Sequence, residues 1–164
     1  MTPPTRNEYE FGQFADYRRH VLDILGRATR EVILFDADLK ETGLESAAGI
    51  AALEAFFTRH TVPDCVRVVV HDAGFIEREC PRLLRLLASF GHRIRIRVSA
   101  RQHAAIDQAF IVVDGQHVLT RFHRDNARGK LILDDGVRAA QLADLFDTVW
   151  ENAQQGPTGM PLGL

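Results

Sequence analysis

The sequence predicts a single α/β domain with a mixed β-sheet that is flanked by helices on both faces. Three observations lead to this fold class. The first half of the chain alternates helical patterns with short apolar runs, the second half holds a hairpin signal, and a long amphipathic segment follows it. Alternating strands and helices pair in parallel through right-handed crossovers, whereas a hairpin adds antiparallel strands. The expected sheet is therefore mixed.

Helical periodicity marks three segments of the first half. Apolar residues recur every three to four positions over residues 14–28 and 45–60, and residues 81–90 repeat the pattern. Two short apolar runs lie between these segments, namely 31–36 (EVILFD) and 65–70 (CVRVVV). Continuous apolar runs of this length are typical of strands that are buried on both faces.

The second half predicts further strands and one closing helix. The strands are expected at residues 93–98 (RIRIRV), 109–113 (AFIVV), 117–122 (HVLTRF) and 130–133 (KLIL). The Asp114-Gly115 dipeptide is a hairpin-turn signal. Residues 137–153 have the spacing of an amphipathic helix, and residues 154–164, with repeated glycine and proline, are expected to be a flexible tail. The domain is thus predicted to span residues 1–153.

Composition narrows the function classes. The chain has 164 residues, of which 46% are hydrophobic and 26% charged, as in a globular domain. The formal net charge of -2 argues against general nucleic-acid binding, although it leaves a local basic patch open. No apolar run approaches the roughly 20 residues that a membrane helix needs, and the first ten residues are polar. We therefore expect a cytoplasmic protein without a membrane partner.

One motif carries a family resemblance. Residues 107–114 read DQAFIVVD. They resemble the His-x-Lys-x-x-x-x-Asp motif of phospholipase D-like domains, which also runs into a strand and a turn. Asp114 stands at the final aspartate of that motif, whereas Asp107 stands where the histidine would be and Ala109 where the lysine would be.

Other segments are similar to the same family. Residues 31–39 (EVILFDADL) resemble its first strand and loop, and residues 146–150 (FDTVW) its closing Phe-x-x-x-Trp. The resemblance covers about residues 14–153. More narrowly, the chain resembles a bacterial group of degenerate phospholipase D-like domains. It implies a phospholipase D-like mixed sheet.

The replaced residues predict that phospholipase D-type catalysis is lost. In the family the histidine attacks phosphorus and the lysine stabilises the phosphoryl oxygens. Asp107 is negative and would repel a phosphodiester, and Ala109 carries no charge. The Gly-Ser turn of the family is also absent, because Arg121 and Phe122 stand at that place. Arg124 lies near the position of the asparagine that follows in the family.

We therefore expect a non-catalytic binding or regulatory module for an anionic ligand or a partner protein. The resemblance places Arg121, Arg124 and Lys130 near the lost active site, with Asp107 and Asp114 shaping it. Such a pocket would hold an anion without cleaving it. Because the family builds its site from two halves, a single half implies a homodimer or pairing with another chain. No cofactor or metal is expected.

Other interpretations stay open. Asp36 and Asp38 follow the first strand and His71 and Asp72 the second, so they are expected at one sheet edge. They could bind a metal or polar ligand, although turn capping is the interpretation we favour. A hydrolase of altered chemistry could use Asp107 or the His71 cluster as nucleophile or base. A pure protein scaffold is the third alternative.

The arginines of residues 93–98 alternate with apolar residues and therefore share one strand face. They could form an anion site. We favour a solvated face or a guard against edge-to-edge aggregation.

Overall fold

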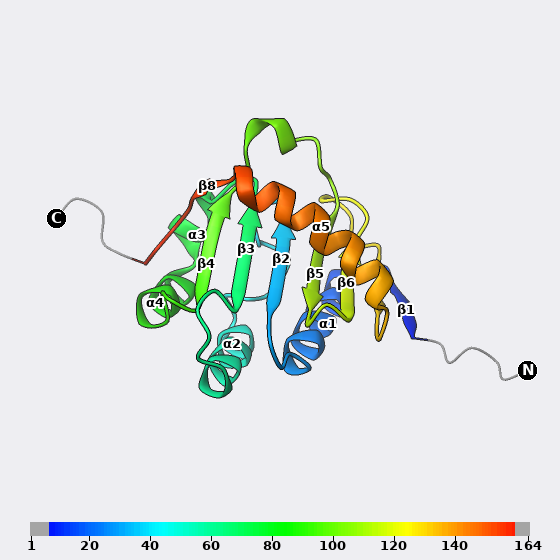
Figure 1. Ribbon diagram of the computed structural model, residues 1–164, viewed down its shortest axis with the longest axis horizontal. Helices are drawn as coiled ribbons and strands as arrows, with labels where there is room; N and C mark the ends of the chain where they lie inside the picture. Colours follow the sequence, from blue (N-terminus) through cyan, green and yellow to red (C-terminus); the bar gives the residue numbers. More distant parts are fainter. Residues whose placement is uncertain (1–6, 160–164) are drawn as a thin grey trace, which may run out of the picture.

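The computed structural model describes residues 7–159, and within them one eight-stranded mixed sheet carries helices on both faces (Figure 1). The predicted fold class is confirmed. The strands follow one another across the sheet in the order β1 (Glu8–Phe11), β7 (Gly129–Ile132), β6 (His117–Arg121), β5 (Ala109–Val113), β2 (Val32–Asp36), β3 (Val66–Val70), β4 (Ile94–Val98) and β8 (Gln154–Gln155). Strands β2, β3 and β4 are parallel to one another, and the other pairings are antiparallel.

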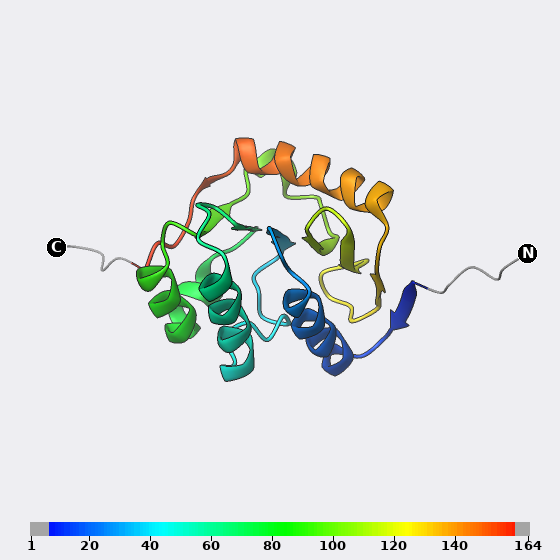
Figure 2. The ribbon, with the colours of Figure 1, turned by 60° about the horizontal axis from the view of Figure 1, so that its bottom comes forward.

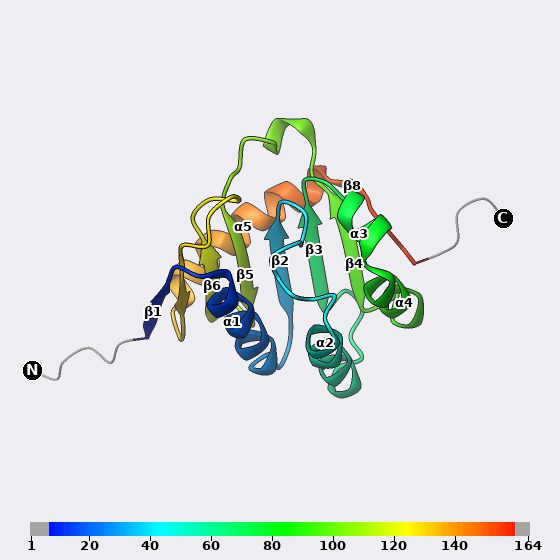
Figure 3. The ribbon, with the colours of Figure 1, turned by 180° about the vertical axis from the view of Figure 1, so that it is seen from behind.

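Helices cover the two faces unequally. Figure 2 shows α1 (Phe14–Gly26), α2 (Ala47–Arg59) and α4 (Pro81–Ser89) on one face and α5 (Gly136–Asn152) alone on the other. The short helix α3 (Gly74–Glu79) lies beside α4, as the view from behind shows (Figure 3). A 3-10 turn (Arg101–His103) lies in the connection between β4 and β5.

The central strands are apolar on both faces because helices cover both. All five residues of β2 are buried. Val32 and Leu34 pack into the core under α1 and α2, whereas Ile33 and Phe35 pack into the core under α5. This period-two division explains why the sequence shows a continuous apolar run instead of an alternating one.

The predicted hairpin joins β5 and β6. Asp114 and Gly115 have φ angles of 56° and 64°, which is the left-handed conformation typical of hairpin turns, and three residues (114–116) connect the paired Val113 and His117. All five residues of β5 are buried, as expected for residues 109–113. The turn fixes the register, so Ala109 lies directly opposite Arg121.

The start of the predicted tail belongs to the sheet. Gln154 and Gln155 form β8 against Val98 and Arg97, and the Gly156 N–H donates to the Ile96 carbonyl over 2.9 Å. The edge of β4 offers unpaired backbone groups, and this segment satisfies part of them. The structure differs from the expected tail at residues 154–156, which extend the sheet beyond the predicted boundary at residue 153, and residues 160–164 lie outside the described part.

Two elements extend the prediction. Strand β1 pairs with β7, with Glu10 opposite Lys130, and α3 precedes the predicted helix at residues 81–90. None of the helices in the described part combines the length and apolar character that a transmembrane span requires.

Candidate functional site

A pocket of about 440 Å³ lies at the edge to which the arrowheads of β2 and β3 point in Figure 1. Because β5 runs antiparallel to β2, the start of β5 and the end of β6 reach the same edge. Open α/β sheets bind ligands beyond the carboxyl ends of their parallel strands. The lining residues are Phe14, Ala37, Asp38, Lys40, Glu41, His71, Asp72, Arg121, Arg124 and Asp125.

A buried ion pair adjoins this pocket, and Arg121, one of its two members, is a lining residue. Arg121 Nη2 lies 2.9 Å from Asp36 Oδ1, and the two side chains are 2% and 1% exposed. Strand β5 lies between β2 and β6, and its residue opposite Arg121 is Ala109. Because Ala109 has no side chain beyond Cβ, Arg121 has room to reach across it to Asp36. Ala109 therefore makes space for the pair.

Other partners hold the two charges in place. The second carboxylate oxygen of Asp36 accepts the backbone N–H groups of Asp38 and Leu39 over 3.1 and 2.7 Å. The Arg121 guanidinium lies 4.7 Å from the ring centre of Tyr17. Burial opposes the charge of Arg121, but Tyr17 and Asp36 keep its pKa above the ordinary value.

The backbone of the following loop also binds Arg121. Its Nη1 donates to the carbonyl oxygens of Arg124 and Asn126 over 3.1 and 3.2 Å. Burial raises the pKa of Asp36, while Arg121 and two backbone N–H groups oppose that rise. Arg121 is therefore a structural cation that ties the loop after β6 to the end of β2.

Asp107 is paired as well. Arg124 Nε lies 2.7 Å from one carboxylate oxygen, and His123 Nδ1 lies 3.0 Å from the other. These hydrogen bonds, with Arg124 first, hold the pKa of Asp107 below its usual range. Arg124 also donates to the carbonyls of Ala104 and Ile106. Asp107 is thus an ionised carboxylate that fastens two loops to each other.

His71 bridges two loops at the same edge. Its Nε2 lies 2.8 Å from the Ile106 carbonyl oxygen and its Nδ1 lies 2.6 Å from Ser99 Oγ. A carbonyl only accepts hydrogen bonds, so Nε2 carries the proton, and the Ser99 hydroxyl can donate to Nδ1 of the neutral ring. Ser99 comes directly after β4, and β4 is parallel to β3, so the sequence held a signal for this pairing.

The acidic residues near the edge act as turn caps. Asp38 Oδ1 accepts the Lys40 N–H over 3.0 Å, and Asp72 Oδ1 accepts the Gly74 N–H over 2.7 Å. The favoured turn-capping interpretation is confirmed for these residues and for Asp36. Among residues 7–159, no three His, Cys, Asp or Glu side chains gather as a metal site would require.

Asp114 lies at the opposite end of the sheet. Its carboxylate accepts the N–H groups of Thr29, Arg30 and Glu31 at 2.8, 2.7 and 3.0 Å, and the Thr29 hydroxyl at 2.8 Å. Burial opposes the charge, but these donors outweigh it and lower the pKa of Asp114. Asp114 therefore fixes the start of β2 and cannot shape the pocket at its end.

Lys130 also lies outside the pocket. It extends from β7 toward β1, where Nζ lies 3.5 Å from Glu8 and 3.9 Å from Glu10. Of the five predicted site residues, the structure therefore brings together Asp107, Arg121 and Arg124. Lys40 and Asp125 also line the pocket and were not predicted, because loop residues carry no periodic signal.

Solved structures confirm the fold. The chain is similar to Nuc, a phospholipase D family member from Salmonella typhimurium, with a TM-score of 0.61 and 17% identity over 91% of this chain and 98% of Nuc. NucT from Helicobacter pylori matches with a TM-score of 0.58 and 10% identity over the same shares. At these identities the likeness shows a phospholipase D-like fold.

A third structure has a different role. TrmBL2, an archaeal chromatin protein whose structure shows a mode of DNA binding, has a TM-score of 0.67 and 16% identity over 94% of this chain. This chain spans 56% of TrmBL2. No curated protein matches the chain. The family model of a domain of unknown function, DUF7931, matches residues 13–158, and the chain therefore belongs to the DUF7931 family.

Proposed function

We propose that this chain is a non-catalytic phospholipase D-like domain that binds a protein partner through the pocket at the carboxyl ends of β2 and β3. The arrangement around Ala109 carries this proposal. The Arg121–Asp36 pair passes over Ala109, where the motif would place a phosphate-binding lysine. Asp107, at the nucleophile position, already accepts hydrogen bonds from Arg124 and His123. Neither position supports phosphoryl transfer by the family mechanism.

The charges of the pocket favour a protein over a free anion. Each lining cation has a carboxylate within 4 Å: Lys40 with Asp38 at 3.8 Å, Arg121 with Asp36 at 2.9 Å and Arg124 with Asp107 at 2.7 Å. The lining further includes Glu41, Asp72 and Asp125. A phosphate would therefore meet repulsion from several carboxylates, whereas a protein surface of mixed charge can match them. A second copy of the chain is the first partner to test, because the family resemblance implies two halves.

The test is self-association measured by size-exclusion chromatography with light scattering over a range of concentrations. We expect a dimer that each single charge reversal, Lys40→Glu or Asp125→Lys, weakens by about tenfold or more in Kd, because a charge that faces an opposite charge across the interface then faces a like charge. Glu54→Lys on the exposed face of α2 is the matched control and should leave the dimer intact. A dimer insensitive to Lys40 and Asp125 would place the interface elsewhere.

Ligand screening separates protein binding from anion binding. Inorganic phosphate and short DNA should leave the melting temperature unchanged, because only a ligand that binds the folded state raises it. DNA is included because TrmBL2 is described as a DNA-binding protein. A shift with either anion that disappears in Lys40→Gln would favour the anionic ligand instead.

A second candidate function is a hydrolase of altered chemistry, and the Ser99–His71 contact of 2.6 Å favours it. A serine beside a histidine that a third group orients is the arrangement of an activated nucleophile. Here the Ile106 carbonyl orients the ring. The test is labelling by a fluorophosphonate followed by mass spectrometry. Labelling at Ser99 that is lost in His71→Ala would support this function, and an unlabelled Ser99 would exclude it.

A further inference from the structure

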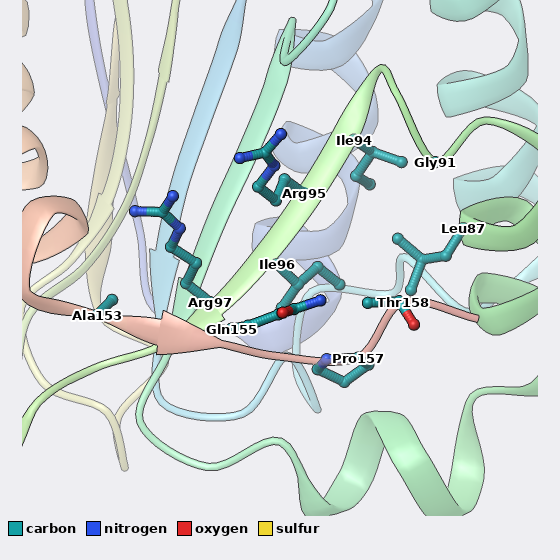
Figure 4. Close-up of a pocket in the computed structure, with 10 residues that line it drawn as sticks. All are labelled: Leu87, Gly91, Ile94, Arg95, Ile96, Arg97, Ala153, Gln155, Pro157 and Thr158. Atoms are coloured by element: carbon teal, nitrogen blue, oxygen red, sulfur yellow. The ribbon is translucent and has the colours of Figure 1, made fainter. Parts of the chain in front are cut away.

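A second pocket, of about 450 Å³, lies along the outer edge of β4 and shares no lining residue with the first (Figure 4). On this side β4 has only the two-residue strand β8 as a neighbour, opposite Arg97 and Val98. Beyond it, the Gly156 N–H still bonds to the Ile96 carbonyl. Pro157 then has no N–H to continue the ladder. Along the edge of β4 that borders the pocket, the Ile94 N–H bonds to the Phe90 carbonyl and the Ile96 carbonyl to Gly156, so among the described residues the Ile94 carbonyl and the Ile96 N–H remain for an added strand.

The two sides of this edge differ in chemistry. Ile94 and Ile96 are buried with Leu87 of α4 in the larger core. Arg95 and Arg97 point to the other side of β4, as Figure 4 shows. The groove is thus bordered by buried apolar side chains on the α4 side of the sheet and by guanidinium groups on the α5 side.

The guanidinium side carries more positive than negative charge. Arg67 of β3 pairs in register with Arg95, and like charges at such positions are destabilising. Asp64 lies 3.3 Å from Arg95, and Asp147 lies 3.5 Å from Arg67. Arg97 stacks over Trp150 at 4.1 Å and donates to its backbone carbonyl over 2.9 Å. Within the described residues, Arg97 adds a third cation without a third carboxylate partner.

We propose that this groove binds an extended segment of a partner protein in which acidic and apolar side chains alternate, and that the segment adds as a strand to β4. Residues that pair across neighbouring strands point to the same face of a sheet. The residue opposite Arg95 therefore lies on the guanidinium side, and residues opposite Ile94 and Ile96 lie beside Leu87. In strand addition the backbone supplies affinity and alternate side chains supply specificity.

The charge pattern selects this occupant over others. The guanidinium side requires acids, whereas the chain's own residues 160–164 (MPLGL) contain none. A nucleic acid would engage the arginines through phosphate and would gain nothing from the strand edge or the isoleucines. A segment in which acidic and apolar residues alternate would contact the arginines, the strand edge and the isoleucines at once. This inference is independent of the proposed function, because it concerns another pocket.

The binding experiment uses the full chain and a labelled peptide with a Val-Glu-Val-Glu-Val core, followed by fluorescence anisotropy. We expect saturable binding of this peptide. A control peptide with the same residues in the order Val-Val-Val-Glu-Glu should bind about tenfold more weakly, because its two adjacent acids place one carboxylate on the apolar side of the groove. Emission of Trp150, the single tryptophan, is a second readout because Arg97 covers its ring. Absent binding, or equal binding of both peptides, would overturn the proposal.

Protein variants test the charge contact. Arg95→Glu should weaken the binding of the alternating acidic peptide by about tenfold, because a cross-strand attraction becomes a repulsion. The same variant should strengthen the binding of a Val-Lys-Val-Lys-Val peptide, because there a repulsion becomes an attraction. Arg95→Gln serves as the milder variant, and Arg59→Glu, exposed on α2, is the matched control. The melting temperature of each variant checks folding. A peptide affinity that does not respond to Arg95 would contradict the assigned groove.

Backbone methylation tests the strand addition itself. A strand offers its N–H groups alternately to its two edges, and an added strand uses only one of them. N-methyl groups on one alternate set of peptide residues should abolish binding, and N-methyl groups on the other set should leave it intact. Equal effects of both sets would contradict strand addition.

Discussion

Replacing Arg121 by methionine would leave the Asp36 carboxylate buried without its counter-charge. Asp36 is 1% exposed, so water cannot take the place of the guanidinium. The carbonyl oxygens of Arg124 and Asn126 would lose a donor in the same step. Removal of one partner from a buried ion pair typically costs about 3–5 kcal/mol. At about 2–4 °C per kcal/mol for a chain of this size, the melting temperature should fall by about 6–20 °C.

A double variant separates the charge effect from the loss of packing. Asp36→Asn keeps an oxygen that can accept the Leu39 N–H but removes the charge. In Arg121→Met/Asp36→Asn no unpaired charge is buried, so the double variant should be more stable than the sum of the single effects predicts, by about 1–3 kcal/mol. Urea unfolding at pH 7 measures all the variants. A cost below about 1 kcal/mol for Arg121→Met, or strictly additive effects, would refute a structural role of this pair.

Three further stability predictions follow from single contacts. The folded-state pKa of Asp114 is lowered, so its contribution to the free energy of unfolding is present above about pH 4 and is lost as the pH falls through the folded pKa. The free energy of unfolding should therefore drop less on acidification in Asp114→Asn than in the wild type. Urea titrations from pH 7 to pH 2 would measure this difference. Ser46 caps α2, and Ser46→Ala should cost about 1 kcal/mol in urea unfolding. A Cβ at Gly129 would collide with the Thr120 carbonyl oxygen, so Gly129→Ala should cost about 3 kcal/mol or more, whereas Gly26→Ala, in open space, should be close to neutral in the same assay.

The fold was predictable where burial leaves a continuous mark on the sequence. Strands β2, β3 and β5 are covered by helices on both faces, and their apolar runs match residues 31–36, 65–70 and 109–113 closely. The edge strands β1 (EYEF) and β8 (QQ) carry no such mark. Their pairing depends on which open edge lies next to them in space, which a local pattern does not encode.

The site was predictable in part. The carboxyl ends of parallel strands meet at one edge, and this rule correctly placed Asp36 and His71 together. The distance along the chain contradicts the grouping of Asp107 with Asp114, because the two residues lie seven positions apart on either side of β5, which is up to about 23 Å at about 3.3 Å per extended residue. The burial of Arg121 depends on the space over Ala109. These two residues are neighbours only across strands, so a local sequence pattern does not show that they meet.

The proposed loss of phospholipase D-type catalysis is tested most directly by turnover of bis(p-nitrophenyl) phosphate with the purified chain and with Asp107→Ala. Asp107 is half-exposed, so its substitution should leave the fold intact. We predict that both proteins release p-nitrophenol at the rate of buffer alone. Turnover by the wild-type chain that disappears in Asp107→Ala would contradict the proposal that this domain is non-catalytic.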